Sequence, residues 1–349
     1  MKISNKGLSK KQNIVVIGGG NGSAISLLAL KPLKGMCTIA SINTTADSGG
    51  SSGILRELLH TIPTGDIMRA VLALSQYDFQ TLRAIFYETR FENLGKLNRH
   101  NIGNLFIALG AQFSGNVIES IRALEQALKC VGHVYPATLD NVQLCAELSN
   151  GQIVKGEAAI DVPTYERSLR IQRVWLEPQG RAYPESAKFL RNADIIILGP
   201  GHLYTSIIPT LLPSGIKEAI AASKAELIFT PPHFYTLENE TGPETLSELV
   251  TELEMYLPRA LDRIIYDDYV PRTEAEQNIY RIKRWKPFLK DSEKLPQQKL
   301  MRVSLHKPGS GMLSEKLAEA FRSILQKRYV PQISGIEKVK IRTNFHNRR

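Results

Sequence analysis

Cysteine is scarce in this 349-residue chain, which contains only Cys37, Cys130 and Cys145. The three residues are far apart in sequence, and none belongs to a Cys-x-x-Cys pair. This excludes a disulfide framework and a zinc site built from paired thiolates. We expect three reduced thiols in the protein core, where free cysteine is usually found.

Long apolar runs are also absent. No stretch approaches the roughly 20 apolar residues that a helix needs to cross a bilayer. Residues 1–12 form a polar, lysine-bearing leader without the apolar stretch of a secretory signal. Together these absences predict a cytoplasmic protein that has no membrane partner.

The charge of the chain is strongly unbalanced, with 44 basic against 34 acidic residues and a net charge of +10. Such an excess is compatible with nucleic acid, an anionic membrane surface or small phosphorylated ligands. Much of it lies in the leader, around Trp285 and in a basic C-terminal tail, residues 331–349. Runs of this kind are usually solvated faces or frayed ends, so we do not expect nucleic acid as a partner and favour a small phosphorylated ligand.

The first regular unit is a strand, a glycine-rich turn and a helix. Residues 13–17 are apolar and mostly β-branched, and the turn at residues 18–22 precedes a segment with helical spacing. A second apolar run at residues 37–42 completes a β-loop-α-β unit, whose two strands are parallel. The expected fold class is α/β, with a doubly wound, mostly parallel Rossmann-like sheet.

Two further elements are predicted within a single nucleotide-binding domain over residues 13–330. Helical spacing over about residues 67–130 indicates a helical insertion. Alternating residues at 142–148 and 153–160 flank Asn150-Gly151, which predicts a small β-hairpin element. Further strands are expected at 171–176, 193–198 and 227–230, and helices at 244–257 and 313–325.

The Gly-Gly-Gly-Asn-Gly turn at residues 18–22 has the composition of a phosphate site. Backbone amides and the positive end of the following helix can surround a phosphate where no side chain blocks its approach. The dinucleotide spacing requires a glycine where this chain has Ser23, and no acidic residue ends the second strand near Asn43. This argues against a nicotinamide dehydrogenase, and a tight turn without ligand remains the alternative.

A second such segment, Asp-Ser-Gly-Gly-Ser-Ser-Gly, occupies residues 47–53 after the second strand. Its glycines allow consecutive N–H groups to face an anion, its serines add donors, and Arg56 can offer a planar fork to a phosphate. Asp47 can hold a Mg²⁺ ion that bridges phosphates, the only cofactor we expect; an Asx-turn or a helix cap is the alternative.

A third glycine turn, residues 199–206, follows the predicted central strand and carries hydroxyls on Tyr204, Thr205 and Ser206. Polar motifs at residues 63–69 and 100–104 add further candidates. Three polar glycine loops at three strand ends converge on one edge of a parallel sheet, where α/β folds bind ligands.

The predicted ligand-binding residues are Gly18, Gly19, Gly20, Asn21, Gly22, Asp47, Ser48, Gly49, Gly50, Ser51, Ser52, Arg56, Gly65, Asp66, Arg69, His100, Asn101, Asn104, Gly199, Pro200, Gly201, Tyr204, Thr205 and Ser206. If the protein is an enzyme, Asp47 and Asp66 are the catalytic candidates, with Arg56 and Arg69 stabilising phosphoryl charge. His100 is expected to contact phosphate or base, or else to cap the helix that follows.

In their order and combination these motifs resemble the family that contains 2-phospho-L-lactate transferase, CofD, and the gluconeogenesis factors called YvcK. The resemblance spans roughly residues 13–245. It is carried by the segments at 18–22, 47–53, 63–66, 100–104 and 193–206.

The resemblance implies a Rossmann-like core, a homodimer and one of two functions. The YvcK branch, which the first two glycine segments resemble more closely, binds UDP-sugars such as UDP-N-acetylglucosamine, is linked to carbon metabolism and cell-envelope growth, and implies a regulated protein partner. The CofD branch is a Mg²⁺-dependent transferase of a phosphoryl-linked group from a nucleotide donor. The chain has no evident Ser-His-Asp or Cys-His arrangement, so whether it catalyses a reaction stays open.

This chain departs from the family pattern at several positions. Asn21 replaces a threonine, Ile54 an arginine, Thr64 a proline and His202 a serine. Residues 229–238 do not reproduce the Asn-x-Met-Thr-Gln-x-Gly-Glu segment of the family, so we expect a different preference for base or sugar.

Overall fold

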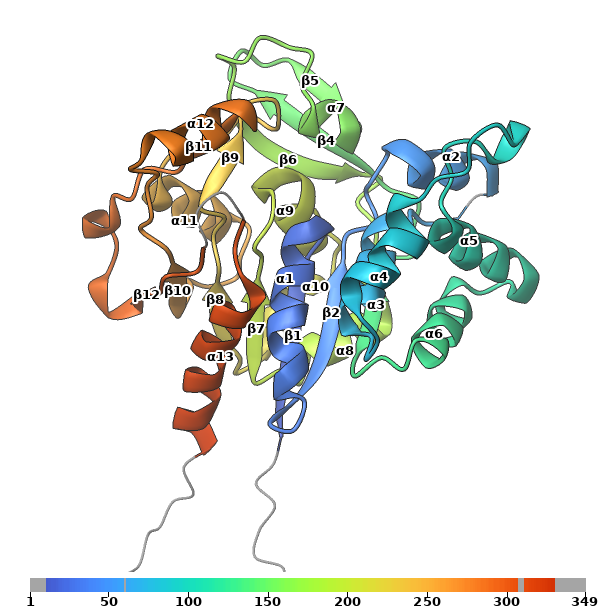
Figure 1. Cartoon of the computed structure of the whole chain (residues 1–349), viewed down its shortest axis with the longest axis horizontal. Coiled ribbons are helices and arrows are strands. Elements are labelled where there is room, and N and C mark those ends of the chain that lie inside the picture. Colours follow the sequence, from blue (N-terminus) through green and yellow to red (C-terminus); the bar gives the residue numbers. More distant parts are fainter. Residues whose placement is uncertain (1–10, 60, 307–310, 330–349) are drawn as a thin grey trace, which may run out of the picture.

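The computed structural model describes residues 11–59, 61–306 and 311–329 (Figure 1). Its centre is a seven-stranded sheet of order β12-β10-β8-β7-β1-β2-β3, in which every pairing is parallel. The strands are β1 (Gln12–Gly18), β2 (Cys37–Asn43), β3 (His133–Pro136), β7 (Ile195–Leu198), β8 (Glu226–Phe229), β10 (Arg263–Tyr266) and β12 (Leu300–Arg302). The predicted parallel Rossmann-like sheet is confirmed. Residues 1–10 of the predicted leader and the whole predicted tail lie outside the described residues.

Successive side chains of a strand point to opposite faces of the sheet, and here both faces are buried. In β1, Ile14 and Val16 join one apolar core, whereas Val15 and Ile17 join the other. The first core is covered by α1 (Gly20–Leu30), α3 (Gly65–Leu74), α6 (Val117–Ala127) and α13 (Ser314–Tyr329). The second is covered by α8 (Pro184–Arg191), α9 (Ile208–Leu211), α10 (Ile216–Ala222) and α11 (Leu246–Met255). The fold is therefore doubly wound.

The predicted helical insertion is present between β2 and β3. Besides α3 and α6 it contains α4 (Phe79–Arg83), a π-helical turn η2 (Ala84–Glu88), η3 (Gly95–Leu97) and α5 (Ile102–Ser114). Residues 50–53, which we predicted as part of a loop, instead form the first turn of α2 (Gly50–Leu59). Small residues are common where a helix begins, so the same composition fits both structures.

A three-stranded antiparallel sheet of order β5-β4-β6 stands apart from the central sheet. It contains β4 (Gln143–Leu148), β5 (Ile153–Lys155) and β6 (Ile171–Glu177). The predicted hairpin is confirmed, but the strand expected over 153–160 ends at Lys155. Gly156, at φ +97°, turns the chain, and α7 (Glu157–Asp161) follows.

A second small ribbon pairs β9 (Phe234–Thr236) with β11 (Trp285–Pro287) beside α12 (Glu274–Ile282). Figure 1 shows both small sheets above the edge at which the central strands end. Short helical turns complete the chain: η1 (Lys31–Leu33), η4 (Leu203–Ile207), η5 (Ser292–Lys294) and η6 (Gln297–Lys299).

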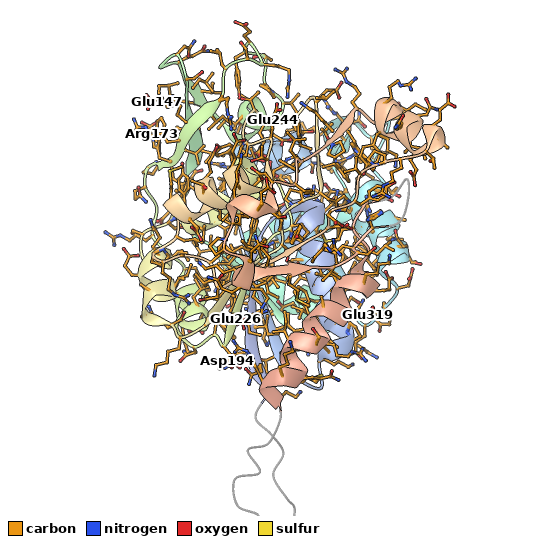
Figure 2. The ribbon with its side chains drawn as sticks, turned by 90° about the vertical axis from the view of Figure 1, so that its left-hand side faces the viewer. Glu147, Arg173, Asp194, Glu226, Glu244 and Glu319 are labelled. Atoms are coloured by element: carbon orange, nitrogen blue, oxygen red, sulfur yellow. The ribbon has the colours of Figure 1, made fainter. Side chains whose placement is uncertain are left out.

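At the opposite end of the central sheet, where the strands begin, ion pairs connect the sheet to α13 and link neighbouring strands. Arg328 of α13 lies 2.6 Å from Glu226 at the start of β8, and Arg263 pairs with the same carboxylate at 2.7 Å. Figure 2 shows Glu226 and Asp194 together near this helix, far from the small sheet that carries Glu147 and Arg173. The edge where the strands end is thus the one left open for a site.

The cysteines are unpaired, as predicted, with Cys37 and Cys145 buried and Cys130 partly buried. Within the described ranges, no helix combines the length and the apolar character needed to span a bilayer.

Replacing Gly22 with alanine should destabilise the fold where α1 meets the loop after β7. A Cβ atom there would lie 2.2 Å from the carbonyl oxygen of Pro200 and 2.8 Å from the amide of Gly201. Overpacking against backbone typically costs about 1–3 kcal/mol, so the unfolding temperature of Gly22→Ala should fall by several degrees in thermal denaturation. Gly35→Ala is the control because a Cβ atom there meets nothing within 4 Å. A Gly22→Ala protein as stable as the control would contradict this close contact.

Candidate functional site

A cavity of about 680 Å³ opens at the carboxyl ends of β1, β2, β7 and β8. Its walls are the segments that follow these strands, namely residues 19–22, 47–52, 200–206 and 232–234. β1 lies where the strand order reverses, since β2 and β3 extend to one side and β7 and β8 to the other. This is the position at which doubly wound sheets bind their ligands.

The first turns of four helices line this cavity. They contribute Gly20 to Gly22 of α1, Gly50 to Ser52 of α2, Gly65 and Asp66 of α3, and Asn104 of α5. The first N–H groups of a helix have no partner within it, and they carry the positive end of the helix dipole. Four such ends around one cavity create a strong preference for negative charge.

Asp66 connects two of these helices and orients the main cation of the cavity. One carboxylate oxygen, Oδ1, accepts hydrogen bonds from the amide of Gly20 and from Nη1 of Arg69, each at 2.9 Å. Gly20 has φ +64°, a conformation that favours glycine. The Arg69 guanidinium also donates to the hydroxyl of Tyr87 and lies 4.4 Å over its ring. Arg69 is therefore held in place before any ligand arrives.

A pair of carboxyl groups, Asp47 and Glu157, also lines the cavity. Asp47 Oδ1 accepts a hydrogen bond from the amide of Gly49 at 2.7 Å. Burial and then the negative charge of Asp66 raise the pKa of Asp47. Burial, together with Asp47, Asp161 and Asp66, raises the pKa of Glu157 to about 9, and Glu157 is hydrogen-bonded to Asp47. The pair accordingly retains a proton at neutral pH.

The amides of the third glycine loop already bind a carboxylate of the protein. Glu240 accepts hydrogen bonds from the backbone N–H groups of Leu203 at 2.6 Å, Tyr204 at 3.1 Å and Thr205 at 3.0 Å. Burial raises the pKa of Glu240 to about 7. The predicted role of the Tyr204 hydroxyl is wrong, because this group is buried and donates to the carbonyl of Ile171.

His202, one of the departures from the family pattern, adds a positive charge to the cavity wall. Its Nδ1 lies 2.7 Å from Oδ1 of Asp161. Burial lowers its pKa, but the Asp161 hydrogen bond and the charge of Glu240 outweigh burial and raise the pKa of His202 to about 9. Burial likewise opposes ionisation of Asp161, yet His202 keeps the pKa of that carboxyl below its usual value.

Most of the residues predicted from sequence come together in this cavity. Its lining includes Gly19, Gly20, Asn21, Gly22, Asp47, Gly49, Gly50, Ser51, Ser52, Gly65, Asp66, Arg69, Asn104, Pro200, Gly201, Thr205 and Ser206. The lining does not include Gly18, Ser48, Arg56, His100, Asn101, Gly199 or Tyr204.

Several of the residues outside the lining form hydrogen bonds with other parts of the protein. Arg56 donates to the side chain of Asn141 at 2.8 Å, so the structure does not bring its guanidinium to the cavity as predicted. His100 Nδ1 lies 2.9 Å from the hydroxyl of Ser51. The N-cap of α5 is Asn101 rather than His100, since the Asn101 side chain accepts from the amide of Asn104.

Sequence reasoning missed the wall formed by α7, η2 and the segment after β8. Glu157 and Asp161 were hidden because their region read as a strand, although Gly156 gave a signal for a break. Tyr87 and Arg90 lie in and after a π-helical turn without a recognisable motif. The departure at residues 229–238 pointed to the remaining wall without identifying its residues.

Asp47 and Glu157 provide only part of a metal site. The described ranges contain no cluster of three histidine, cysteine or acidic side chains that could hold a metal ion. A Mg²⁺ ion at these carboxyl groups would need further oxygen ligands, which Mg²⁺ commonly takes from water and from substrate phosphates. The two side chains therefore fit a metal that is shared with a ligand.

Comparison with known proteins identifies related sequences and folds. Residues 14–307 match the family described as 2-phospho-L-lactate transferase CofD. The chain is 40% identical over 220 residues to the gluconeogenesis factor of Listeria innocua, a match covering 63% of this chain and 66% of that protein, just under two thirds. It is 34% identical over 290 residues to the gluconeogenesis factor of Halalkalibacterium halodurans, covering 82% and 86% of the two chains.

A solved structure has the same architecture. The crystal structure of a UPF0052 family protein from Bacillus halodurans superposes with a TM-score of 0.80 at 31% identity. The superposition covers 90% of this chain and 99% of the other. At this identity and coverage, the shared fold includes the sheet edge that carries the cavity.

The protonated carboxyl pair predicts that the ligand-free protein is more stable at pH 6 than at pH 9. The pKa of Glu157 is higher in the folded protein, at about 9, than the ordinary 4.5 of an unfolded chain. The folded state therefore holds a proton that the unfolded state releases, and stability falls as pH rises between these values. Glu157→Gln should reduce this slope in chemical denaturation, whereas Glu319→Gln on the exposed face of α13 should not. An unchanged slope in Glu157→Gln would refute the shared proton.

Proposed function

The chain belongs to the CofD family, and on that premise we propose that it is a regulatory protein of the gluconeogenesis factor type that binds a nucleotide-sugar. UDP-sugars such as UDP-N-acetylglucosamine are the leading ligands, as the YvcK resemblance implies. The observation that carries the proposal is the convergence of four helix N-termini with Arg69 on one cavity of about 680 Å³. A cavity of this size suits a small-molecule ligand, and its charge pattern suits phosphates.

The phosphates have one preferred location in this cavity. The first turns of α1 and α2 present backbone N–H groups and the hydroxyls of Ser51 and Ser52. Arg69, fixed by Asp66 and Tyr87, offers its guanidinium to the same space. We place the diphosphate between these groups, because charge-assisted and backbone hydrogen bonds to phosphate need no further rearrangement there.

The acidic wall explains why a divalent cation would accompany the phosphates. Asp47, Asp66, Glu157 and Asp161 line the same cavity and would repel a diphosphate. A Mg²⁺ ion held by Asp47 and Glu157 would neutralise charge between the carboxylates and the phosphate oxygens. Asp47 and Glu157 would release their proton as the cation binds, since metal ligands act in the deprotonated form.

Among the residues that the structure describes, the cysteines and the charged cavity histidine offer no prepared nucleophile or base, which fits a regulatory role. Burial raises the pKa of Cys37 to about 11 and that of Cys130 to about 12, so neither supplies a thiolate. The histidine on the cavity wall with a carboxylate partner, His202, is charged at neutral pH and cannot act as a base. The consequence of ligand binding would then pass to a protein partner, in keeping with a link to carbon metabolism.

One observation favours the alternative, a CofD-like Mg²⁺-dependent transferase. The pKa of Glu157 is displaced to about 9 beside the preferred phosphate location. Carboxyl groups with strongly raised pKa values are frequent at catalytic sites, where they exchange protons with the reacting groups. In this alternative, Mg²⁺ binding would first displace the shared proton of Asp47 and Glu157. The resulting carboxylates would then accept the proton of an acceptor hydroxyl as its oxygen bonds to the phosphoryl-linked group and the nucleotide leaves.

Calorimetric titration should detect binding of UDP-N-acetylglucosamine or another UDP-sugar in the presence of Mg²⁺. GDP, GTP and NAD complete the panel, and chromatography of each mixture reveals any nucleotide product. Arg69→Ala should weaken binding about 10- to 100-fold, the usual scale for one lost hydrogen bond to a charged group. Arg322→Ala, on the exposed face of α13, is the matched control.

Selective binding without turnover would support the regulator, whereas Mg²⁺-dependent loss of a guanine nucleotide or another donor would support the transferase. Absence of binding to every member of the panel would refute the nucleotide assignment.

Mg²⁺ dependence should disappear when one carboxylate of the acidic pair is removed. Asp47→Asn leaves a side chain of similar shape but takes away a negative charge and an anionic ligand. We expect wild-type affinity for UDP-sugar to fall at least tenfold when EDTA replaces Mg²⁺, and the Asp47→Asn affinity to be low and nearly independent of Mg²⁺. A wild-type protein that binds equally well in EDTA would rule out a shared metal.

A further inference from the structure

A buried histidine without hydrogen-bond partners forms one end of the cavity. His233 follows β8 and precedes β9; it is 5% exposed and belongs to the cavity lining. Neither of its ring nitrogens, Nδ1 or Nε2, has a partner among the described residues. A buried polar group that has lost its water and gained no protein partner disfavours folding. Such a group at the wall of a cavity points to a ligand.

The position of His233 is fixed by its neighbours rather than by its own ring nitrogens. Its carbonyl accepts a hydrogen bond from the amide of Phe288 at 3.3 Å. The adjacent Phe234 lies in the ribbon with β11, and its ring stacks on Trp285 at 3.9 Å. The loop is thus held at the histidine backbone and at the residue after it, which leaves the imidazole as a preorganised contact.

The nearby charged groups form no hydrogen bond with this imidazole. His306 lies 6.1 Å away, ring to ring, and its Nδ1 is committed to Asp267. Burial lowers the pKa of His233 to about 4, and Lys290 and His306 act in the same direction against Asp267. The imidazole is therefore neutral at physiological pH, with one N–H donor and one lone-pair acceptor. A neutral ring of this kind suits an uncharged polar group rather than a phosphate.

The topology separates His233 from the phosphate location. In the central sheet β8 is two strands from β1, and neighbouring strands lie about 4.8 Å apart, so their ends are about 10 Å apart. A nucleotide with its phosphates at the first turn of α1 would direct its other end along the row of strand ends toward β8. Asn104, at the phosphate end, also keeps an unpartnered buried oxygen, Oδ1.

We propose that His233 is a specificity-determining residue, which hydrogen bonds the uncharged nucleoside end of the ligand. The inference rests on the proposed nucleotide site and adds the orientation of the ligand within it. Phosphates lie between α1 and α2, and the nucleoside lies beneath the loop after β8. His233 belongs to the segment, residues 229–238, in which this chain departs from its family pattern.

The test compares the binding of UDP and of inorganic pyrophosphate, both with Mg²⁺, by calorimetry. His233→Phe keeps a planar ring and removes both polar atoms. We expect it to weaken UDP binding at least about tenfold, the scale of one lost buried hydrogen bond, and to leave pyrophosphate binding within about twofold. His233→Gln restores a donor and an acceptor and should recover part of the UDP affinity. Arg69→Ala should weaken both ligands.

Thermal denaturation without ligand separates this role from a structural one. His233→Phe should be at least as stable as the wild-type protein, because it removes a buried group without partners.

His133→Phe, at the exposed start of β3, is the matched control and should bind UDP normally. A loss of the same factor for UDP, CDP and GDP would place the ribose at His233, whereas unequal losses would place the base there; both support the proposal.

Two results would overturn the inference. If the wild-type protein binds UDP and His233→Phe binds it equally well, the nucleoside lies elsewhere while the proposed function stands. If the wild-type protein binds neither UDP nor pyrophosphate, and no UDP-sugar either, the proposed function fails and this inference fails with it.

Discussion

The structure around the site depends on one electrostatic constraint. Several helix N-termini with partial positive charge meet at one cavity, and nearby negative charge stabilises them. Carboxylates of the chain itself supply part of this negative charge. Asp66 accepts from the first amide of α1, Asp47 accepts from Gly49 just before α2, and Glu240 accepts from three consecutive amides after β7. The Asp66 and Glu240 contacts join segments that the folded sheet brings to one edge, whereas the Asp47 contact lies within a single loop. The cavity is consequently preformed around anions before a ligand enters.

The same constraint crowds negative charge, and the pKa shifts follow from this crowding. Asp47 and Glu157 are too close together and too buried for both to ionise freely, so the pair retains a proton. His202 becomes charged against Asp161 and Glu240 for the same reason. A phosphate ligand can enter this field only with compensation, either from a proton or from a divalent cation.

The sequence predicted strands β1, β2, β7 and β8 and the sheet edge at which the cavity lies, because both depend on local patterns, whereas β3, β10 and β12 were not predicted. The β-branched runs before residues 18–22 and 199–206 are enough to place glycine loops at the ends of parallel strands. It could not predict which anion each loop binds, since Glu240 lies far along the chain from Leu203. Nor could it distinguish a loop from the first turn of α2, because Gly-Ser-Ser is common in both. Arg56 looked like a phosphate ligand, but Asn141 takes its guanidinium in the folded protein.

The two ends of the cavity differ in the kind of chemistry they offer, and this difference has a consequence for specificity. At the α1 end the donors are mainly backbone amides, which any sequence with enough glycine can supply, so the proposed phosphate contacts do not depend on a residue such as Asn21. At the β8 end the polar atoms belong to a side chain, His233, held by the ribbon of β9 and β11. Under the proposed function, a change of residue there would alter the groups that face the ligand without disturbing the backbone proposed to hold the phosphates. Ligand preference would then diverge within one fold through the loop after β8 while the proposed phosphate site stays the same.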